Sequence, residues 1–345
     1  MTSTELSHGT FAINMLIDAM IKAVGDEYEV AEIEGDAVLL IRKGEAPSKK
    51  EILDICIKIF NAFHFQRKWM QQHAICPCGA CLEINNLTLK FVVHHGPVAE
   101  IKVGRFVKQS GPEMIIAHRL LKNSINNNEY LLMSEKLLEQ VPDPAGPADF
   151  EWISSSEEYG SIGRVGYRFT LLNEARKKCP APPEPQTAYP TDNTPYLELI
   201  IGANYRDVYM VMMNIPGRAE WMPGLQKVEQ EIPQVFVGSV HYCMFDEFRT
   251  IVSPLKMTYS PEKIFYAESC TIKELDLSLV HEFVFTKINE DSCHFAWRLL
   301  NASHTLIPEE LNTALKEKMQ MIAERLKEKC TNMEASLFEP AFRHN

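Results

Sequence analysis

The stretch VAEIEGDAVLLI at residues 30–41 sets the pattern for the first half of the chain. One apolar run leads up to Gly35, Asp36 follows at the bend, and a second apolar run leaves it. This pattern predicts a β-hairpin that is buried on at least one face, with the glycine permitting the turn. A carboxylate at a hairpin tip can bind a metal ion, or it can hydrogen-bond its own backbone in the turn. Both roles stay open for Asp36 at this point.

Helices and paired strands are predicted to alternate around this hairpin. Apart from the hairpin, the predicted elements are helices at residues 11–24, 50–70 and 113–121, and strands at residues 87–94, 98–106 and 163–172. The helices are recognised by apolar residues that recur at spacings of three and four. The strands at 87–94 and 98–106 are separated only by His95-Gly96-Pro97, so they are expected to pair with each other as a hairpin. This order predicts an α+β sandwich.

A proline-rich stretch divides the chain. Residues 179–195 hold six prolines in 17 positions, which rules out regular packing and predicts an extended linker. A length of 345 residues suits about two domains. The predicted organisation is a first domain at residues 1–176, a linker at 177–195, a second domain at 196–332 and a tail at 333–345.

Charge and composition exclude several classes of protein. The net charge of −11 offers no basic face to a phosphate backbone, so nucleic acid is not an expected partner. No window approaches the roughly 20 apolar residues that span a bilayer, and residues 11–24 lack the basic start and the cleavage site of a signal peptide. Nine cysteines, an odd number, fit free thiols in a reducing compartment. We therefore predict a cytoplasmic protein.

The second half of the chain has a different order of elements. The predicted elements are a strand at residues 196–202, a short helix at 204–214, a turn-rich elbow at 215–224, a series of strands from 225 to 300, and a long helix from Pro308 to about Lys329. One helix packed across a long antiparallel sheet requires the sheet to curve around it. A cavity between helix and sheet is the natural place for a ligand.

A cysteine-rich segment, HAICPCGAC, stands apart from both halves. It brings His73, Cys76, Cys78 and Cys81 within nine residues. Three thiolates and one imidazole could complete a tetrahedral zinc site. Two other interpretations remain: a redox loop in which Cys78 and Cys81 form a disulfide under oxidation, and an inert reduced loop.

Three motifs in the first half resemble those of the class III nucleotide cyclase homology fold. They are Glu34-Gly35-Asp36 in the hairpin, His94-His95-Gly96 after a strand, and GPEMIIAHR at residues 111–119, where a helix starts. Within that superfamily, residues 1–175 are most similar to the DUF2652 family. The resemblance implies a ferredoxin-type α/β sandwich and a homodimer, because cyclase-like domains form their sites between two chains.

The resemblance also implies roles for individual residues. Asp36 matches one of the two metal-binding aspartates, and Arg119 matches an arginine that stabilises the transition state. Glu32 and Lys108 stand at the positions that read the base. Ile115 replaces the asparagine expected to hydrogen-bond the ribose. Cyclisation needs two metal ions and those hydrogen-bond donors, so the resemblance implies a degenerate module for dimerisation or nucleotide sensing.

One strand of the cyclase pattern is missing from this sequence. The second metal aspartate belongs to a D-x-S-G-type strand before the first helix, and the sequence starts at Met1 where that strand would end. The hypothesis is a truncated start. In-frame codons for such a segment upstream are its test.

The second half resembles the START-like superfamily, also called SRPBCC, which includes polyketide cyclase-like proteins. The motifs are LELIIGANYRDVYMVMMNI at residues 197–215, Trp221-Met222-Pro223-Gly224 at the elbow, and GSVHYCM at residues 238–244. The resemblance implies a helix-grip fold, with a curved antiparallel sheet around a long C-terminal helix and a deep apolar cavity between them.

Aromatic and apolar residues at strand spacing are the candidates for lining that cavity, although the same pattern is typical of ordinary core. The candidates are Trp221, Tyr242, Met244, Phe265, Phe283, Phe285, Phe295 and Trp297. Polar groups that could orient a ligand are His241, Glu282, His294 and Arg298.

The resulting functional hypothesis is a non-catalytic protein that binds a hydrophobic small molecule, lipid or polyketide-like, by apolar burial. The alternative is an enzyme, either a divergent nucleotidyl cyclase or a polyketide cyclase-like activity. A pure interaction module is a third interpretation.

Overall fold

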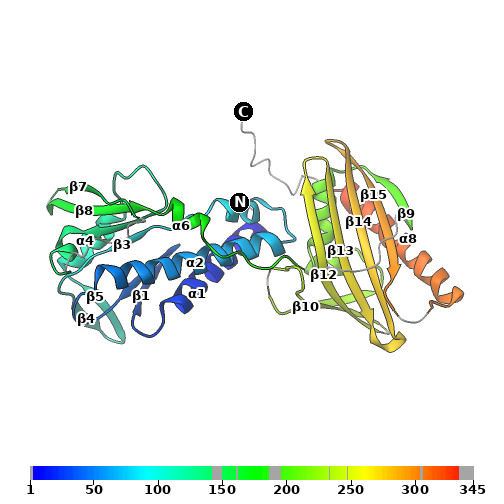
Figure 1. Cartoon of the computed structure of the whole chain (residues 1–345). Helices are drawn as coiled ribbons and strands as arrows, with labels where there is room; N and C mark the ends of the chain where they lie inside the picture. The colour runs from blue at the N-terminus through cyan, green and yellow to red at the C-terminus, as the bar shows by residue number, and fades with distance from the viewer. Residues whose placement is uncertain are drawn as a thin grey trace. The chain divides into compact units, whose positions relative to one another are not determined.

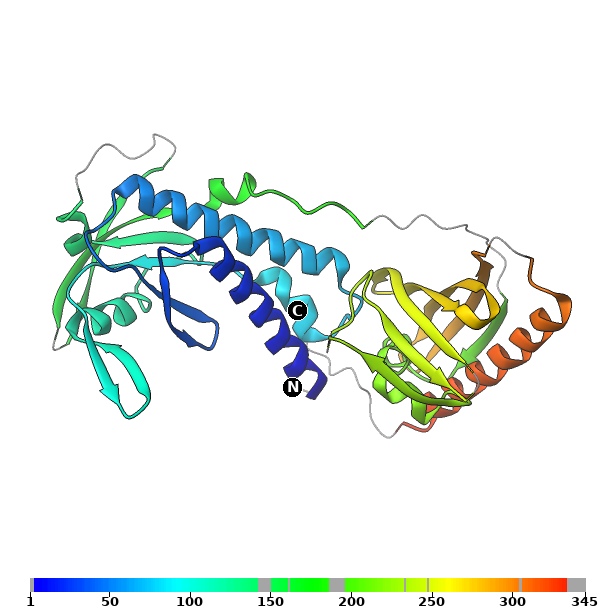
Figure 2. The same cartoon turned by 90° about the horizontal axis from the view of Figure 1, so that it is seen from below.

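The chain folds into two compact units (Figure 1, Figure 2). The computed structural model describes residues 3–141, 150–160, 162–185, 196–232, 234–246, 248–303 and 306–333. The helix-grip unit consists of Met1–Phe11, Met70–Glu83 and Pro183–Asn345, and the α+β unit consists of Ala12–Trp69 and Ile84–Pro182. Most of the predicted linker, residues 186–195, and the predicted tail from residue 334 lie outside the described residues.

The α+β unit contains a four-stranded sheet of order β3-β6-β8-β7 and two separate hairpins, β1-β2 and β4-β5. Its strands are β1 (Glu29–Glu34), β2 (Ala37–Ile41), β3 (Phe91–Val93), β4 (Ala99–Val103), β5 (Phe106–Ser110), β6 (Tyr130–Ser134), β7 (Ile153–Tyr159) and β8 (Gly163–Leu171). Its helices are most of α1 (Ser3–Val24) and α2 (Lys49–His73), with η1 (Ile84–Asn86), α4 (Pro112–Leu120), α5 (Glu135–Leu138) and α6 (Asn173–Lys177). A mixed α+β architecture, as predicted, is thus confirmed.

The core of the α+β unit forms where α2 covers the sheet. Ile52 and Phe60 of α2 are buried in one cluster with Leu131 and Met133 of β6. Every residue of β6 is buried. The apolar spacing of α2 therefore places one face of the helix on the central strand of the sheet.

The structure corrects two expectations for this unit. The hairpin at residues 30–41 forms, with Gly35 at φ 65°, but its predicted burial is wrong for β1, where Val30 and Ile33 are 37% and 53% exposed. The predicted pairing of 87–94 with 98–106 is also wrong. β3 pairs in parallel with β6, and β4 pairs with β5. Parallel pairing joins strands far apart in sequence, which local turn signals cannot reveal.

The helix-grip unit is built on a seven-stranded antiparallel sheet of order β10-β11-β12-β13-β14-β15-β9. Its strands are β9 (Leu197–Ile201), β10 (Leu225–Gln230), β11 (His241–Phe245), β12 (Arg249–Ser260), β13 (Lys263–Ile272), β14 (Leu277–Asn289) and β15 (Ser292–Asn301). Its helices are α3 (Gly79–Glu83), α7 (Tyr205–Met213), η2 (Pro216–Glu220), η3 (Lys273–Leu275) and α8 (Glu309–Thr331).

Helix α8 lies along one face of this sheet, as the orange-to-red helix of Figure 1 and Figure 2 shows. Met319, Ala323 and Leu326 of α8 are buried in one cluster with Tyr266 and Phe295 of the sheet. The spacing of four and three puts these residues on a single helix face. This arrangement is the helix-grip-like fold that the sequence predicted. No helix among the described residues is long and apolar enough to cross a membrane.

Two segments from the first half of the sequence belong to the helix-grip unit, namely Met1–Phe11 and Met70–Glu83. Ala74 forms a β-bridge with Phe236, and the Val237 amide donates to the His73 carbonyl at 2.8 Å. The Tyr209 hydroxyl donates to the carbonyl of Ile75. The predicted boundary at the proline-rich stretch would leave these two segments in the α+β unit, whereas they belong to the helix-grip unit.

Candidate functional site

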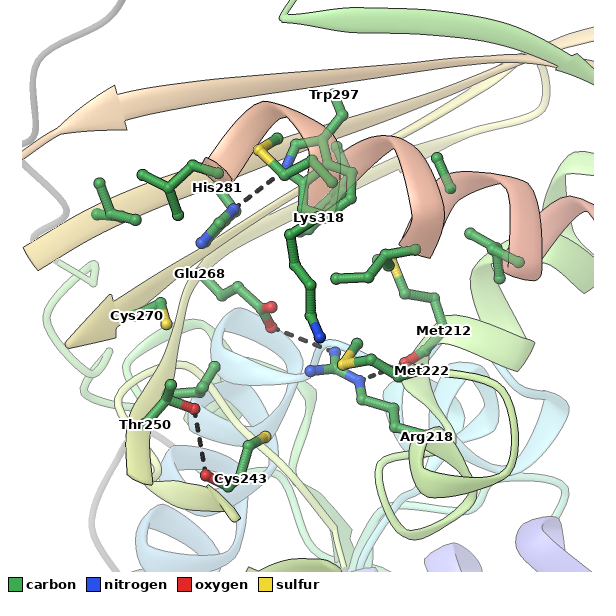
Figure 3. Close-up of a pocket in the computed structure, with 18 of the residues that line it drawn as sticks. Met212, Arg218, Met222, Cys243, Thr250, Glu268, Cys270, His281, Trp297 and Lys318 are labelled. Carbon is green, nitrogen blue, oxygen red and sulfur yellow. Dashed lines mark hydrogen bonds and ion pairs between the residues drawn. The ribbon is translucent and has the colours of Figure 1, made fainter. Parts of the chain in front are cut away.

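A cavity of about 140 Å³ lies between α8 and the sheet of the helix-grip unit (Figure 3). Its lining is mostly apolar and aromatic. The lining side chains that carry a charge or a polar nitrogen or oxygen are Arg218, Trp221, Thr250, Glu268, His281, Trp297 and Lys318. An apolar cavity with a few fixed polar groups is the usual composition of a small-molecule site.

A buried ion pair forms part of the cavity wall. The Arg218 guanidinium lies 3.3 Å from a carboxylate oxygen of Glu268, and these residues are only 2% and 6% exposed. Arg218 Nε also donates to the Met212 carbonyl at 2.8 Å (Figure 3), and the Tyr266 hydroxyl donates to Glu268 at 2.8 Å. Because these bonds satisfy both charges, the pair is held rigidly among apolar neighbours.

Each residue of this pair favours the charged form of its partner. Burial, the largest single cause, raises the pKa of Glu268, but Arg218, the two histidines His241 and His281 and the Tyr266 hydroxyl together lower it by more, so the pKa lies below its ordinary value. Burial likewise opposes the charge of Arg218, and Glu268 raises the pKa of the guanidinium above its ordinary value. Both groups are therefore charged at neutral pH.

His281 presents a hydrogen-bond donor to the cavity. Trp297 Nε1 donates to His281 Nδ1 at 3.1 Å, and burial lowers the pKa of His281 to about 4. A neutral imidazole that accepts at Nδ1 carries its hydrogen on Nε2. Lys318 of α8 also lines the cavity, and its Nζ donates to the Pro223 carbonyl at 2.6 Å. The polar groups therefore favour a ligand with a hydrogen-bond acceptor or a negative charge.

The structure divides the predicted cavity residues into three groups. Trp221, Phe283, Phe295 and Trp297 line the cavity. Phe285 is fully buried in the same apolar cluster without lining it. Tyr242, Met244 and Phe265 belong to the opposite face of the sheet. Successive side chains of a strand point to opposite faces of the sheet. The residues of β11 and β13 that line the cavity are instead Cys243, Phe245, Glu268, Cys270 and Ile272.

The polar residues predicted to orient a ligand lie elsewhere. Glu282 and Arg298 approach each other at 3.6 Å on the opposite face, and His294 lies 3.5 Å from Glu198. His241 is fully buried, but it is not among the described residues that line the cavity. Sequence reasoning missed Glu268, His281 and Lys318. His281 lies two positions before Phe283 on one strand, so both side chains face the same side of the sheet. This spacing is the sequence signal that could have identified the histidine.

The α+β unit holds a second cavity, of about 350 Å³, lined by residues of α1, β1, β2, α2, β3 and α4. Asp36 at the hairpin tip and Glu32 line it, and Lys108 approaches Glu32 at 3.3 Å. The structure thus brings together the two residues at the predicted base-reading positions. Arg119 is exposed and is not among the described lining residues, and Ile115 is 55% exposed.

A buried polar network explains the His94-His95-Gly96 motif without catalysis. His94 lies 2.7 Å from the Ser134 hydroxyl through Nδ1 and 2.7 Å from Glu113 through Nε2, and Lys136 donates to Glu113. A side chain at Gly96 would approach the Glu113 side chain to 2.6 Å. Ser134 is 1% exposed and also caps α5, so the network holds the end of β3 to α4 and α5.

The cysteine-rich segment gathers around a different histidine from the one predicted. The ligand atoms of His8, Cys76, Cys78 and Cys81 all lie within 4.8 Å of one another, and all three cysteines are buried free thiols. His73 ends α2 and is not part of this cluster among the described residues. His8 comes from α1, 68 residues before Cys76, and no local sequence signal pairs them.

Comparisons with known proteins give one family and several distant structural likenesses. The sequence matches the family DUF2652, Protein of unknown function, at residues 13–130. It is 33% identical over 150 residues to Uncharacterized protein Rv2561/Rv2562 of Mycobacterium tuberculosis (strain ATCC 25618 / H37Rv), an alignment that covers 42% of this chain and 70% of that protein.

Two solved structures resemble part of the chain at 12% identity. One is a STAR-related lipid transfer protein (fragment 25–204) from Xanthomonas axonopodis, with a TM-score of 0.33 over 41% of this chain and 89% of that one. The other is a START superfamily protein from Mycobacterium smegmatis, with a TM-score of 0.30 over 39% and 94%. Since these scores are low, the helix-grip description rests on strand order and on α8. The family match and the Mycobacterium tuberculosis relative show that the chain belongs to the DUF2652 family.

Proposed function

We propose that the helix-grip unit binds a hydrophobic small molecule, lipid or polyketide-like, in the cavity beneath α8. The observation that carries the proposal is an apolar cavity whose wall contains a buried ion pair and a neutral histidine donor. The two cationic side chains, Arg218 and Lys318, outnumber the single carboxylate of Glu268. A carboxylate or another acceptor group on the ligand complements this arrangement.

The cavity size limits the part of the ligand that is enclosed. At about 140 Å³ the cavity is close to an engineered apolar cavity of about 150 Å³ that binds benzene. The enclosed group is therefore about one aromatic ring in size. Burying a ring of ~150–250 Å² contributes about 4–6 kcal/mol before the cost of association. Because the cost of association is subtracted from this amount, a ring-sized probe is expected to bind with a Kd no tighter than tens of μM.

The test uses three ring-sized probes that differ only in their polar group. Titration of the full chain, followed by ligand-observed NMR, is expected to show binding of 4-methylbenzoate, weaker binding of toluene and none of benzylamine. Ala323→Leu fills the cavity from α8 and is expected to weaken 4-methylbenzoate binding at least tenfold. Met321→Phe enlarges a side chain on the exposed side of the same helix and serves as the control.

Two outcomes would overturn this assignment. Equal binding by wild type and Ala323→Leu would place the probe outside the cavity. Preference for benzylamine would contradict the predicted role of Arg218, His281 and Lys318. Mass spectrometry of apolar molecules that copurify with the full chain then identifies the natural ligand class, and a cyclised polyketide among them would favour the enzymatic alternative.

For the α+β unit we propose a degenerate nucleotide cyclase-like module that serves in dimerisation or nucleotide sensing. The order of elements, the hairpin with Asp36 at its tip, and the pairing of Glu32 with Lys108 support this proposal. Ile115 has no group that can hydrogen-bond a ribose, which argues against turnover. The proposal therefore assigns this unit a binding role.

Incubation of the full chain with ATP or GTP and Mn²⁺ is expected to yield no cyclic nucleotide above background, because the catalytic amide is replaced by Ile115. Liquid chromatography of the reaction measures the product, and Asp36→Ala is the matched control. A cyclic product that wild type forms and Asp36→Ala does not would overturn this prediction and favour a divergent nucleotidyl cyclase.

A further inference from the structure

We propose that His8, Cys76, Cys78 and Cys81 bind one zinc ion in a closed, structural site. The four residues come from the N-terminal part of α1, the loop after α2 and the short helix α3. All belong to the helix-grip unit. The proposal is independent of the ligand cavity and of the α+β unit.

The separations within the cluster are those of a tetrahedral zinc shell. Zn–S bonds of about 2.3 Å and Zn–N bonds of about 2.0–2.1 Å place a sulfur and a nitrogen about 3.6 Å apart and two sulfurs about 3.8 Å apart. The sulfurs of Cys78 and Cys81 lie 3.6 Å and 3.5 Å from His8 Nδ1. No pair of ligand atoms in the cluster exceeds 4.8 Å. These separations allow one ion at the centre of the cluster to contact all four groups.

The kinds of ligand select zinc over other common ions. Three thiolates with one imidazole form a soft sulfur and nitrogen set, whereas calcium and magnesium prefer oxygen. Cys78 and Cys81 have the C-x-x-C spacing of structural zinc sites, and α3 begins between them at Gly79. Four protein ligands leave no open position for a water molecule or a substrate, so the site is structural.

A buried side chain outside the ligand set supports one of the sulfurs. Gln234 Nε2 donates to the Cys81 sulfur at 3.1 Å, and Gln234 is fully buried. Such hydrogen bonds orient metal ligands and stabilise their charge. Phe236, two residues further on, bridges to Ala74 and packs against Phe11 at a ring separation of 6.0 Å. The metal would therefore tie two distant segments to the chain that precedes β11.

The direct test is the metal content of the full chain purified under reducing conditions without chelator. Atomic emission is expected to find about one zinc per chain. His8→Ala is expected to lower the zinc content at least tenfold, whereas His73→Ala, the control, keeps it at the wild-type level. His8→Cys is expected to retain zinc, which separates loss of a ligand from loss of the fold.

The affinity for zinc gives a second test, in a variant that keeps all four ligands. In competition with a chromophoric chelator, Gln234→Ala is expected to weaken zinc binding about 10–100-fold, and Gln226→Ala, an exposed control, to leave it unchanged. Cobalt substitution is expected to give the intense visible bands of a tetrahedral thiolate site. Less than a tenth of a zinc per chain in wild type, zinc loss in His73→Ala but not in His8→Ala, or an iron–sulfur chromophore would overturn the proposal.

Discussion

Replacing Glu268 with glutamine is expected to lower the free energy of unfolding by about 3–5 kcal/mol. The change keeps the shape of the side chain but removes its charge, and Arg218, only 2% exposed, then stays buried without a counter-ion. The loss of stability arises from the buried guanidinium without a counter-ion rather than from the lost attraction between the two charges. Urea unfolding of the full chain measures the effect by fluorescence, since Trp221 and Trp297 both line the cavity.

Two variants separate this explanation from general disruption. Replacing both partners, Arg218→Met with Glu268→Leu, is expected to recover most of the loss, because an apolar pair of similar volume leaves no buried charge. Glu229→Gln removes an exposed carboxylate that pairs with Lys227 at 2.9 Å and is expected to change stability by less than about 1 kcal/mol. Equal effects of Glu268→Gln and Glu229→Gln would show that Arg218 does not depend on Glu268.

Acidification is expected to destabilise the helix-grip unit between about pH 6.5 and pH 4. Burial is the main cause that lowers the pKa of His241 and of His281 to about 4; Arg218 contributes to this lowering, and Glu268 opposes it. The unfolded chain takes up these two protons near pH 6.5, whereas the folded chain excludes them until about pH 4. Stability is therefore complete above pH 6.5 and falls by up to about 2.7 kcal/mol per pH unit below it, about 7 kcal/mol in all.

The pH dependence of urea unfolding measures this loss. His241 is fully buried, and neither of its ring nitrogens has a hydrogen-bond partner among the described residues, so His241→Leu is expected to halve the slope without a large cost at pH 7.5. His294→Leu changes a partly exposed histidine and is expected to leave the slope unchanged. If His241→Leu does not reduce the dependence of the free energy of unfolding on pH, protonation of His241 is not a cause of that dependence.

Local features of the sequence were enough to predict many of the elements, but not β6 or β7, because backbone periodicity acts over a few residues. The predicted helix from Pro308 to about Lys329 corresponds to α8 (Glu309–Thr331). The bend at Gly35-Asp36 corresponds to the turn between β1 and β2. The parallel pairing of β3 with β6 could not be predicted from local features, because it depends on contacts between residues 40 positions apart.

The sequence by itself determined some of the residues that could carry chemistry. It identified the cysteines of the segment at residues 73–81, the carboxylate at the hairpin tip, and the aromatic strands that build the cavity wall. It did so because composition and spacing specify ligand types and strand or helix faces within a segment.

Only the tertiary structure decided which of these residues meet. It brought His8, rather than His73, to Cys76, Cys78 and Cys81, and it paired Arg218 with Glu268 inside the cavity wall. It also placed Tyr242 on the face of the sheet opposite the cavity, because the next residue, Cys243, lines the cavity. The physical reason is that strand register and long-range packing are set by the burial of whole faces, which no short stretch of sequence specifies.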